Sequence, residues 1–323
     1  MKITILRKAF SVFIRLKDVF FMFLMLLIFP KLVHKFSTRK FLYPNSYCYS
    51  VNEKPKLPFK LIKNKKKIKK YDEINLIAAN KDINLQMLKN VKIPTFLNYF
   101  WQTIKISSEG NLFYSGKGHL SYTYNNFEKV IKKKRLKEYK NQNIIYVHSY
   151  EKTLIKFSNK GHNVLFIDPY IKISKNLYKS ESNFLKKKNF QKILKKKNFS
   201  TICVGQNYLK DKHPDNYYKG VQFGSFLTTI GALSFIAKKI NIYGWDYYFR
   251  SSVKNMGFFN FLKNMYNYEL DKRSKNHFET GLFQLYYASV LSKNPRFKIS
   301  GKLVGIQKHK FILKKIEKAI FNN

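Results

Sequence analysis

Cysteine is nearly absent from this chain. Cys48 and Cys203 are the only two, they lie far apart, and neither belongs to a CxxC pair. The sequence therefore predicts neither a disulfide framework nor a cysteine-based zinc site. A reducing, cytosolic setting fits this cysteine usage best.

Acidic residues are scarce as well. Asp and Glu number 18 against 63 Lys and Arg, which gives a formal charge of +45. Such an excess suits nucleic acid, an anionic membrane surface or an anionic substrate. An AT-rich coding bias toward Lys, Asn, Ile, Phe and Tyr produces the same excess without any binding role. Among binding roles, the membrane surface and anionic ligands are favoured.

A full-length transmembrane run is also missing. The wholly apolar stretch at residues 19–29 (VFFMFLMLLIF) is shorter than the ~20 residues that a spanning helix requires. Basic residues flank it on both sides, and no small-residue cleavage site follows. We predict that residues 1–36 form a monotopic or re-entrant membrane anchor, with a true span as the alternative. The rest of the chain is then expected at the cytoplasmic face of the inner membrane.

Residues 37–72 read as a basic linker, because Pro44, Pro55, Pro58 and the run Lys65–Lys67 leave little periodicity. The lysine run is either a solvated linker or an aid to membrane adhesion. With 45% hydrophobic and 17% aromatic residues, the remainder can bury a core.

Short apolar runs alternate with helical patterns over residues 73–305, which predicts an α/β domain with a mostly parallel sheet. A helical or mobile lid is expected at residues 249–276. A basic amphipathic helix is expected at 306–323, packed on the domain or on lipid. The expected strands are Ile74–Ile77, Thr95–Leu97, His119–Tyr124, Ile144–Val147, Val164–Ile167, Ile202–Val204, Ile240–Tyr243 and Phe297–Ile299.

The stretch from Gly220 to Tyr248 is the centre of the predicted domain. Ser225 fits a helix N-cap, the apolar spacing that follows predicts a helix, and Lys238-Lys239 suit its last turn. A buried strand then ends at Gly244. Ligands of open α/β sheets lie outside the carboxyl ends of strands and at helix N-termini. We therefore expect a site at Gly224-Ser225 and at Trp245-Asp246-Tyr247-Tyr248.

Polar motifs follow the predicted strands in a set order. Asn80, Asn98 and Asn125 come first, then Gly224-Ser225, then Gly244-Trp245-Asp246-Tyr247-Tyr248, and finally His277 at the start of a helix. This order and spacing, over roughly Ile74 to Leu303, resembles the bacterial sialyltransferases of glycosyltransferase family 42, which use CMP-activated sialic acid. In that family the first strand is followed by GNGPS, and two further strands are each followed by Asn. A helix then begins after TSG, and the next strand is followed by G-(I/V)-D-F-Y. A lid comes next, and a His stands at the start of the helix after it.

The resemblance implies a Rossmann-like, mostly parallel sheet of a GT-A-like variant. It also implies metal-independent, inverting transfer of sialic acid or a related acidic sugar from a CMP donor to a glycan or lipid-linked glycan acceptor. No cofactor is implied beyond the CMP-sugar itself, and the sequence accordingly has no DxD motif. A homo-oligomer is compatible with this assignment.

The resemblance also implies a role for individual residues of the site. His277 is the general base, and Tyr248 donates a hydrogen bond to the leaving phosphate. Lys254 stands where the family has a second tyrosine, and its cation, with Arg250, offers an alternative partner for that phosphate. Gly244 and Asp246 order the loop. The remaining donor-binding candidates are Asn80, Asn98, Asn125, Gly224 and Ser225.

Two other functions remain open at this point. A basic nucleic-acid-binding protein has the charge in its favour, but the chain lacks a helix-turn-helix, zinc or RNP pattern. A glycosyltransferase-like protein without activity is the other alternative, because Ala78-Ala79-Asn80 lacks the GNGPS glycines and Lys254 replaces a tyrosine.

Overall fold

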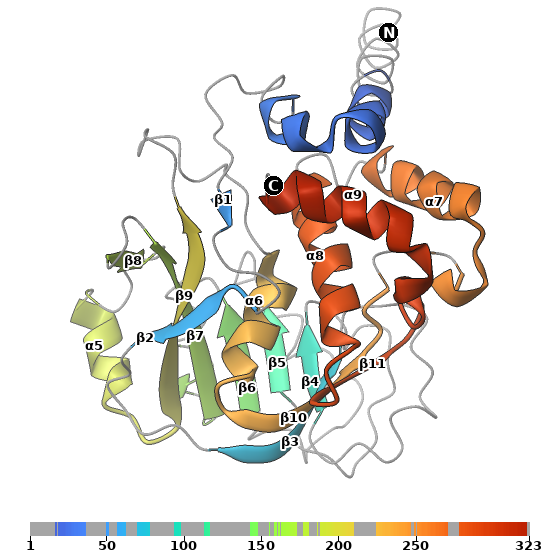
Figure 1. Cartoon of the computed structure of the whole chain (residues 1–323). Helices are drawn as coiled ribbons and strands as arrows, with labels where there is room; N and C mark the ends of the chain where they lie inside the picture. The colour runs from blue at the N-terminus through green and yellow to red at the C-terminus, as the bar shows by residue number, and fades with distance from the viewer. Residues whose placement is uncertain are drawn as a thin grey trace, which may run out of the picture.

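The computed structural model describes residues 17, 19–36, 50–51, 57–62, 70–77, 94–97, 113–116, 143–147, 155, 158–159, 161, 163–172, 177–180, 186, 188–209, 224–246, 249, 251–270 and 278–321. The strands of this part of the chain all belong to one curled sheet (Figure 1). They are β1 (Ser50–Val51), β2 (Phe59–Ile62), β3 (Tyr71–Ile77), β4 (Pro94–Leu97), β5 (Phe113–Gly116), β6 (Asn143–Val147), β7 (Asn163–Lys172), β8 (Tyr178–Ser180), β9 (Phe199–Leu209), β10 (Ala237–Tyr243) and β11 (Phe297–Ser300).

The sheet is mostly parallel. Its order is β1-β9-β7-β6-β5-β4-β3-β10-β11, with β2 also on β9 and β8 also on β7. Neighbouring strands pair in parallel along the whole path β9-β7-β6-β5-β4-β3-β10-β11. Only β1, β2 and β8 pair antiparallel among the described strands. The predicted α/β class with a mostly parallel sheet is confirmed at this level.

The strand order reverses between β3 and β10. From β3 the chain adds β4 to β7 and β9 on one side. Helix α6 (Gly224–Leu233) then leads back to β10, which pairs with the other side of β3, and β11 follows beyond it. This reversal is a topological switch point, the place where open parallel sheets form a crevice for ligands.

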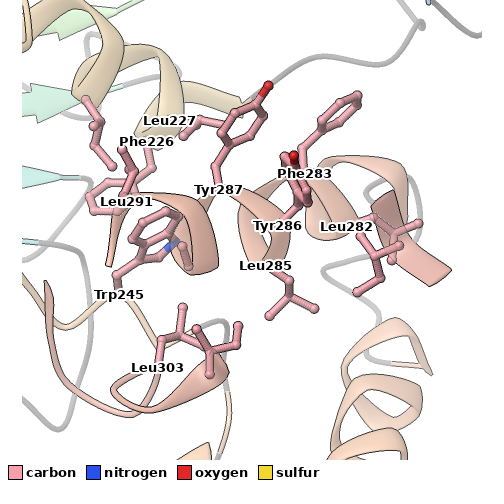
Figure 2. Packing of buried hydrophobic residues seen from close by; sticks show 14 of the residues in the cluster. Phe226, Leu227, Trp245, Leu282, Phe283, Leu285, Tyr286, Tyr287, Leu291 and Leu303 are labelled. Carbon is pink, nitrogen blue, oxygen red and sulfur yellow. The ribbon is translucent and has the colours of Figure 1, made fainter. Parts of the chain in front are cut away.

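The core lies between the sheet and the helices on one of its faces (Figures 1 and 2). Ile74, Leu76, Ile240 and Ile242 point into it from β3 and β10, because alternate residues of a strand face the same side. The helices that cover them are α6, α8 (Phe278–Leu291) and α9 (Lys310–Phe321), which packs on α8. Each fully buried side chain of this size stabilises the fold by about 1.5–3 kcal/mol.

The described part of the segment predicted as a membrane anchor, from residue 19 to residue 36, packs into this core. Residues 19–28 form a helix, and the 3-10 helix η1 (Pro30–Phe36) follows. Met22, Leu26 and Val33 are buried in the same cluster as the sheet residues. Phe23 meets Tyr266 edge to face, with ring centroids 5.6 Å apart. In the described parts of the chain, no helix has the length and apolarity needed to cross a membrane.

Part of the predicted linker is sheet. β1 and β2 both lie within residues 37–72 and pair with β9. The buried Phe59 of β2 lies so close to Gly231 of α6 that a Cβ there would come within 2.2 Å of the Phe59 ring. Pro58 directly precedes β2 and does not prevent it, because an edge strand can begin after a proline.

Lys238 and Lys239 lie in β10, and the prediction that they end a helix was wrong. Their side chains point to opposite faces of the sheet, and each meets a carboxylate of β3. Lys238 Nζ lies 2.8 Å from Asp72 Oδ1, and Lys239 Nζ lies 3.6 Å from Glu73 Oε2. The hydrogen bond from Lys238 lowers the pKa of Asp72. These pairs explain how a strand accommodates two consecutive lysines.

Other predicted elements occur with different lengths. β7 and β9 extend well beyond the expected ranges Val164–Ile167 and Ile202–Val204. The strand that follows β4 is β5, which ends at Gly116, before the strand expected at His119–Tyr124. The expected strand His119–Tyr124 lies outside the described residues. The lysine-dense segment contains α5 (Lys188–Leu194). The described part of the predicted lid consists of η7 (Val253–Asn255) and α7 (Phe258–Leu270), whose Phe261 and Met265 are fully buried.

Candidate functional site

Three neighbouring strands end level with one another at the switch point. Ile77 of β3 lies opposite Tyr243 of β10, and Tyr243 lies opposite Ser300 of β11. The loops that leave these strands therefore start from one edge of the sheet. This carboxyl edge is the candidate site.

Glycines open the loops after β10 and β11. Gly244 has a φ of 68° and Gly301 a φ of 125°, both in the region that L-residues seldom adopt. The Gly244 amide donates a hydrogen bond to the Ser300 carbonyl at 3.1 Å. A Cβ on Gly301 would lie 2.5 Å from Asp246 Oδ1. The close approach of the two loops therefore depends on the absence of a side chain at Gly301.

Asp246 joins these two loops. Its carboxylate is buried, and Oδ1 accepts a hydrogen bond from the Lys302 amide at 2.6 Å. Its carbonyl accepts from the Phe249 amide at 2.9 Å, and the Lys302 carbonyl accepts from the Val253 amide at 2.9 Å. Hydrogen bonds of this kind fix a loop, because a buried carboxylate needs amide donors in place of water.

Trp245 connects this loop to the start of α6. The buried indole meets Phe226, in the first turn of α6, with ring centroids 5.4 Å apart and planes inclined by 64°. Figure 2 shows both rings beside Leu291 of α8. The N-terminal turn of α6, whose first backbone N–H groups have no acceptor within the helix, thus lies beside the loop after β10. The Trp245 Nε1 atom is buried and has no hydrogen-bond partner among the described residues.

A polar strip runs along the opposite face of β3 and β10 toward this edge. Asn241 Nδ2 donates to Asn75 Oδ1 at 2.7 Å and also to Glu73 Oε1. Both asparagines are buried, and within the described part of the chain Asn241 Oδ1 has no hydrogen-bond partner. Burial raises the pKa of Tyr243, and the Glu73 carboxylate adds to the rise. An amide and phenol surface of this kind can hydrogen-bond a polar ligand.

The structure places six of the predicted site residues, which are Gly224, Ser225, Gly244, Trp245, Asp246 and Lys254. Gly224 and Ser225 form the first turn of α6, and Gly244 and Asp246 lie in the loop after β10. The contact of Phe226 with Trp245 brings these two segments together.

Lys254 lies in η7, which the Val253–Lys302 hydrogen bond attaches to the same loops, and its side chain is exposed. Its carbonyl accepts from Lys308 Nζ at 3.4 Å. The other predicted residues lie outside the described parts of the chain: Asn80, Asn98, Asn125, Tyr248, Arg250 and His277.

Several residues of this edge were missed by the sequence reasoning. Gly301 follows an apolar strand just as Gly244 does, so a signal for it was present in the sequence. No local pattern indicates that Lys302 supplies the amide for Asp246. His309, which is buried and stacked on Phe261 with ring centroids 4.1 Å apart, places Nε2 3.0 Å from the Val253 carbonyl. This contact attaches His309 to the first residue of η7.

Comparisons with known proteins provide no family for the chain. No family model matches the sequence, and no curated protein and no solved structure matches it. Within the described ranges, no group of three or more His, Cys, Asp or Glu side chains is arranged to hold a metal ion.

Proposed function

We propose that this chain is a glycosyltransferase with a Rossmann-like, GT-A-like fold, similar to the bacterial sialyltransferases. It moves sialic acid or a related acidic sugar from a CMP donor to a glycan or lipid-linked glycan, without a metal. One observation carries the proposal. The loop Gly244–Asp246 and the first turn of α6 meet beside the topological switch point, and these segments carry two of the motifs on which the resemblance depends.

In this proposal the acceptor hydroxyl oxygen attacks the anomeric carbon of the sugar from the face opposite the phosphate. The bond from that carbon to the phosphate oxygen breaks, so the configuration inverts and CMP leaves. His277 takes the proton of the acceptor hydroxyl. Tyr248 donates a hydrogen bond to the departing phosphate, and the cations of Lys254 and Arg250 offset its negative charge.

The remaining candidate residues hold the donor. The N–H groups of the first turn of α6, at Gly224 and Ser225, favour an anionic group at the positive end of the helix dipole. Asn80, Asn98 and Asn125 supply amide donors and acceptors for the cytidine, ribose or sugar hydroxyls. The helix α7 belongs to the lid that covers the bound donor.

CMP release tests this proposal. The purified chain is incubated with CMP-sialic acid, and released CMP is quantified with and without a glycan acceptor. His277→Ala is expected to lower the release by about 10²–10⁴-fold, the usual contribution of a general base. Asp72→Asn is the matched control, because its exposed carboxylate lies toward the amino end of β3, and release should not change.

Three results would contradict the proposal. Equal CMP release by the wild type and by His277→Ala removes His277 as the base. No binding of CMP-nucleotides, together with salt-dependent binding of DNA or RNA, supports the basic nucleic-acid-binding alternative instead. Binding of CMP without any release identifies an inactive member of the fold.

A further inference from the structure

The helix at residues 19–28 is apolar around its whole circumference. Its sequence, VFFMFLMLLI, contains no polar side chain. A helix of this kind is expected either inside a protein core or in a lipid environment. In this fold it lies at the surface, against η1, α7 and α9 (Figure 1).

Only one half of this helix is covered by protein. Val19, Met22, Phe23, Met25 and Leu26 are buried in the core cluster. On the other side, Phe20 is 62% exposed, Leu24 is 40% exposed and Ile28 is 53% exposed. The four-residue spacing puts these three side chains in one row along the helix, and Phe29 extends the exposed row. We call Phe20, Leu24, Ile28 and Phe29 the apolar row.

Exposed lysines flank the apolar row in the chain and also occur on the neighbouring helix α9. The exposed Lys17 and Lys31 stand at its two ends in the chain. Helix α9, which packs against η1, exposes Lys310, Lys314 and Lys318 along one side. Apolar side chains bordered by lysines match the two layers of an anionic bilayer surface, acyl chains below and phosphates above.

From these observations we infer that the apolar row is a docking surface for an anionic phospholipid bilayer, with the helix lying in the interface. The buried half of the helix belongs to the folded domain, so the domain and its docking surface form one body. A second copy of the chain is a poor occupant, because each copy carries a formal charge of +45. This inference does not depend on the transfer reaction.

Vesicle flotation of the full chain tests the inference. The probes are vesicles of phosphatidylcholine alone and vesicles of phosphatidylcholine mixed with phosphatidylglycerol. Wild type is expected to float with the mixed vesicles and to bind them more weakly as salt is raised. The double variant Leu24→Ser/Ile28→Ser should bind at least about tenfold more weakly, because it loses two apolar contacts with the acyl region.

Two further variants separate the apolar from the electrostatic contribution. Lys17→Glu/Lys31→Glu should weaken binding to the mixed vesicles by about tenfold or more and leave binding to pure phosphatidylcholine unchanged. Leu177→Ser, which removes a 55% exposed leucine beside β8, is the matched control and should bind as the wild type does. Thermal unfolding of each variant confirms that the fold is intact, since all the changes lie at exposed positions.

The following results would overturn the inference. Wild type fails to float with the mixed vesicles, or Leu24→Ser/Ile28→Ser floats as well as wild type. A wild-type dimer in solution that becomes monomeric in the Leu24→Ser/Ile28→Ser variant shows that a second copy covers the apolar row instead.

Discussion

The rings of Phe226 and Trp245 meet edge to face, with their centroids 5.4 Å apart. Phe226 belongs to the first turn of α6, and Trp245 belongs to the loop after β10. This contact holds a helix N-terminus against the carboxyl edge of the sheet. The candidate site therefore depends on a buried apolar contact as much as on its polar groups.

Phe226→Leu is expected to lower the free energy of unfolding by about 1–3 kcal/mol, because it removes the aromatic pair and leaves a gap against the indole. Urea unfolding measures the change. Phe259→Leu is the control, since Phe259 is 82% exposed, and its effect should stay within about 0.5 kcal/mol. Equal effects of the two substitutions would contradict the importance of the buried pair.

Gly301→Ala is expected to destabilise the fold by about 1–3 kcal/mol, because alanine is strained at this φ and its Cβ meets the Asp246 carboxylate. Gly257→Ala is the matched control. A Cβ on Gly257 would meet nothing within 4 Å, so the substitution should cost at most about 1 kcal/mol, the loss expected for alanine at the position before a helix. Differential scanning calorimetry distinguishes the two outcomes.

Asp246→Ala leaves the Lys302 amide without its acceptor, and we expect a loss of about 1–3 kcal/mol. In the Asp246→Ala background, Gly301→Ala should cost less than it does alone, because the atom that its Cβ meets is gone. A double-mutant cycle should give a coupling of about 0.5–3 kcal/mol. Strict additivity would show that the two loops do not meet as described.

Leu26→Ala and Leu24→Ala should separate the two halves of the N-terminal helix. Leu26 is fully buried, so its truncation should cost about 2–5 kcal/mol. Leu24 belongs to the apolar row, and its truncation should cost at most about 1 kcal/mol. If Leu26→Ala unfolds at the same urea concentration as the wild type, the helix is not part of the folded core.

Tyr286 makes stability depend on alkaline pH. Burial raises its pKa to about 12, and the Glu317 carboxylate adds to the rise. An unfolded tyrosine releases its proton near pH 10, so the folded state alone keeps the proton between about pH 10 and 12. Its contribution to stability is complete below about pH 10 and is lost as pH rises toward about 12. Urea unfolding of Tyr286→Phe along this pH series should show a shallower loss, and identical slopes would rule out this contribution.

The central strands could be predicted because their apolar runs are local. Ile74–Ile77 and Ile144–Val147 stand out from polar flanks, and both are strands. The ends of longer strands could not be predicted, because β7 continues through Asp168 and Pro169 and β9 through Gly205. Pairing with neighbours, not sequence preference, extends them.

Some residues of the loops at the candidate site could also be predicted from a local pattern, and others could not. Gly244 and Asp246 form a short pattern after a strand, and the structure places both in the loop at the carboxyl end of β10. Their partners Gly301 and Lys302 lie in a distant part of the chain, and no periodicity links them to Asp246. The apolar run at residues 19–29 identified the hydrophobic segment. It could not indicate that one half of the segment belongs to the core, because both halves have the same composition.

The pairing of β3 with β10 determines when this protein can finish folding. The Asn75–Asn241 hydrogen bond joins residues that are 166 positions apart. During synthesis β3 emerges long before β10, so one edge of β3 lacks its partner while residues 78–236 are made. Late closure of such distant pairs slows folding and exposes a strand edge that other chains can join. Expression should therefore benefit from a holding chaperone, and chains truncated before residue 237 should aggregate.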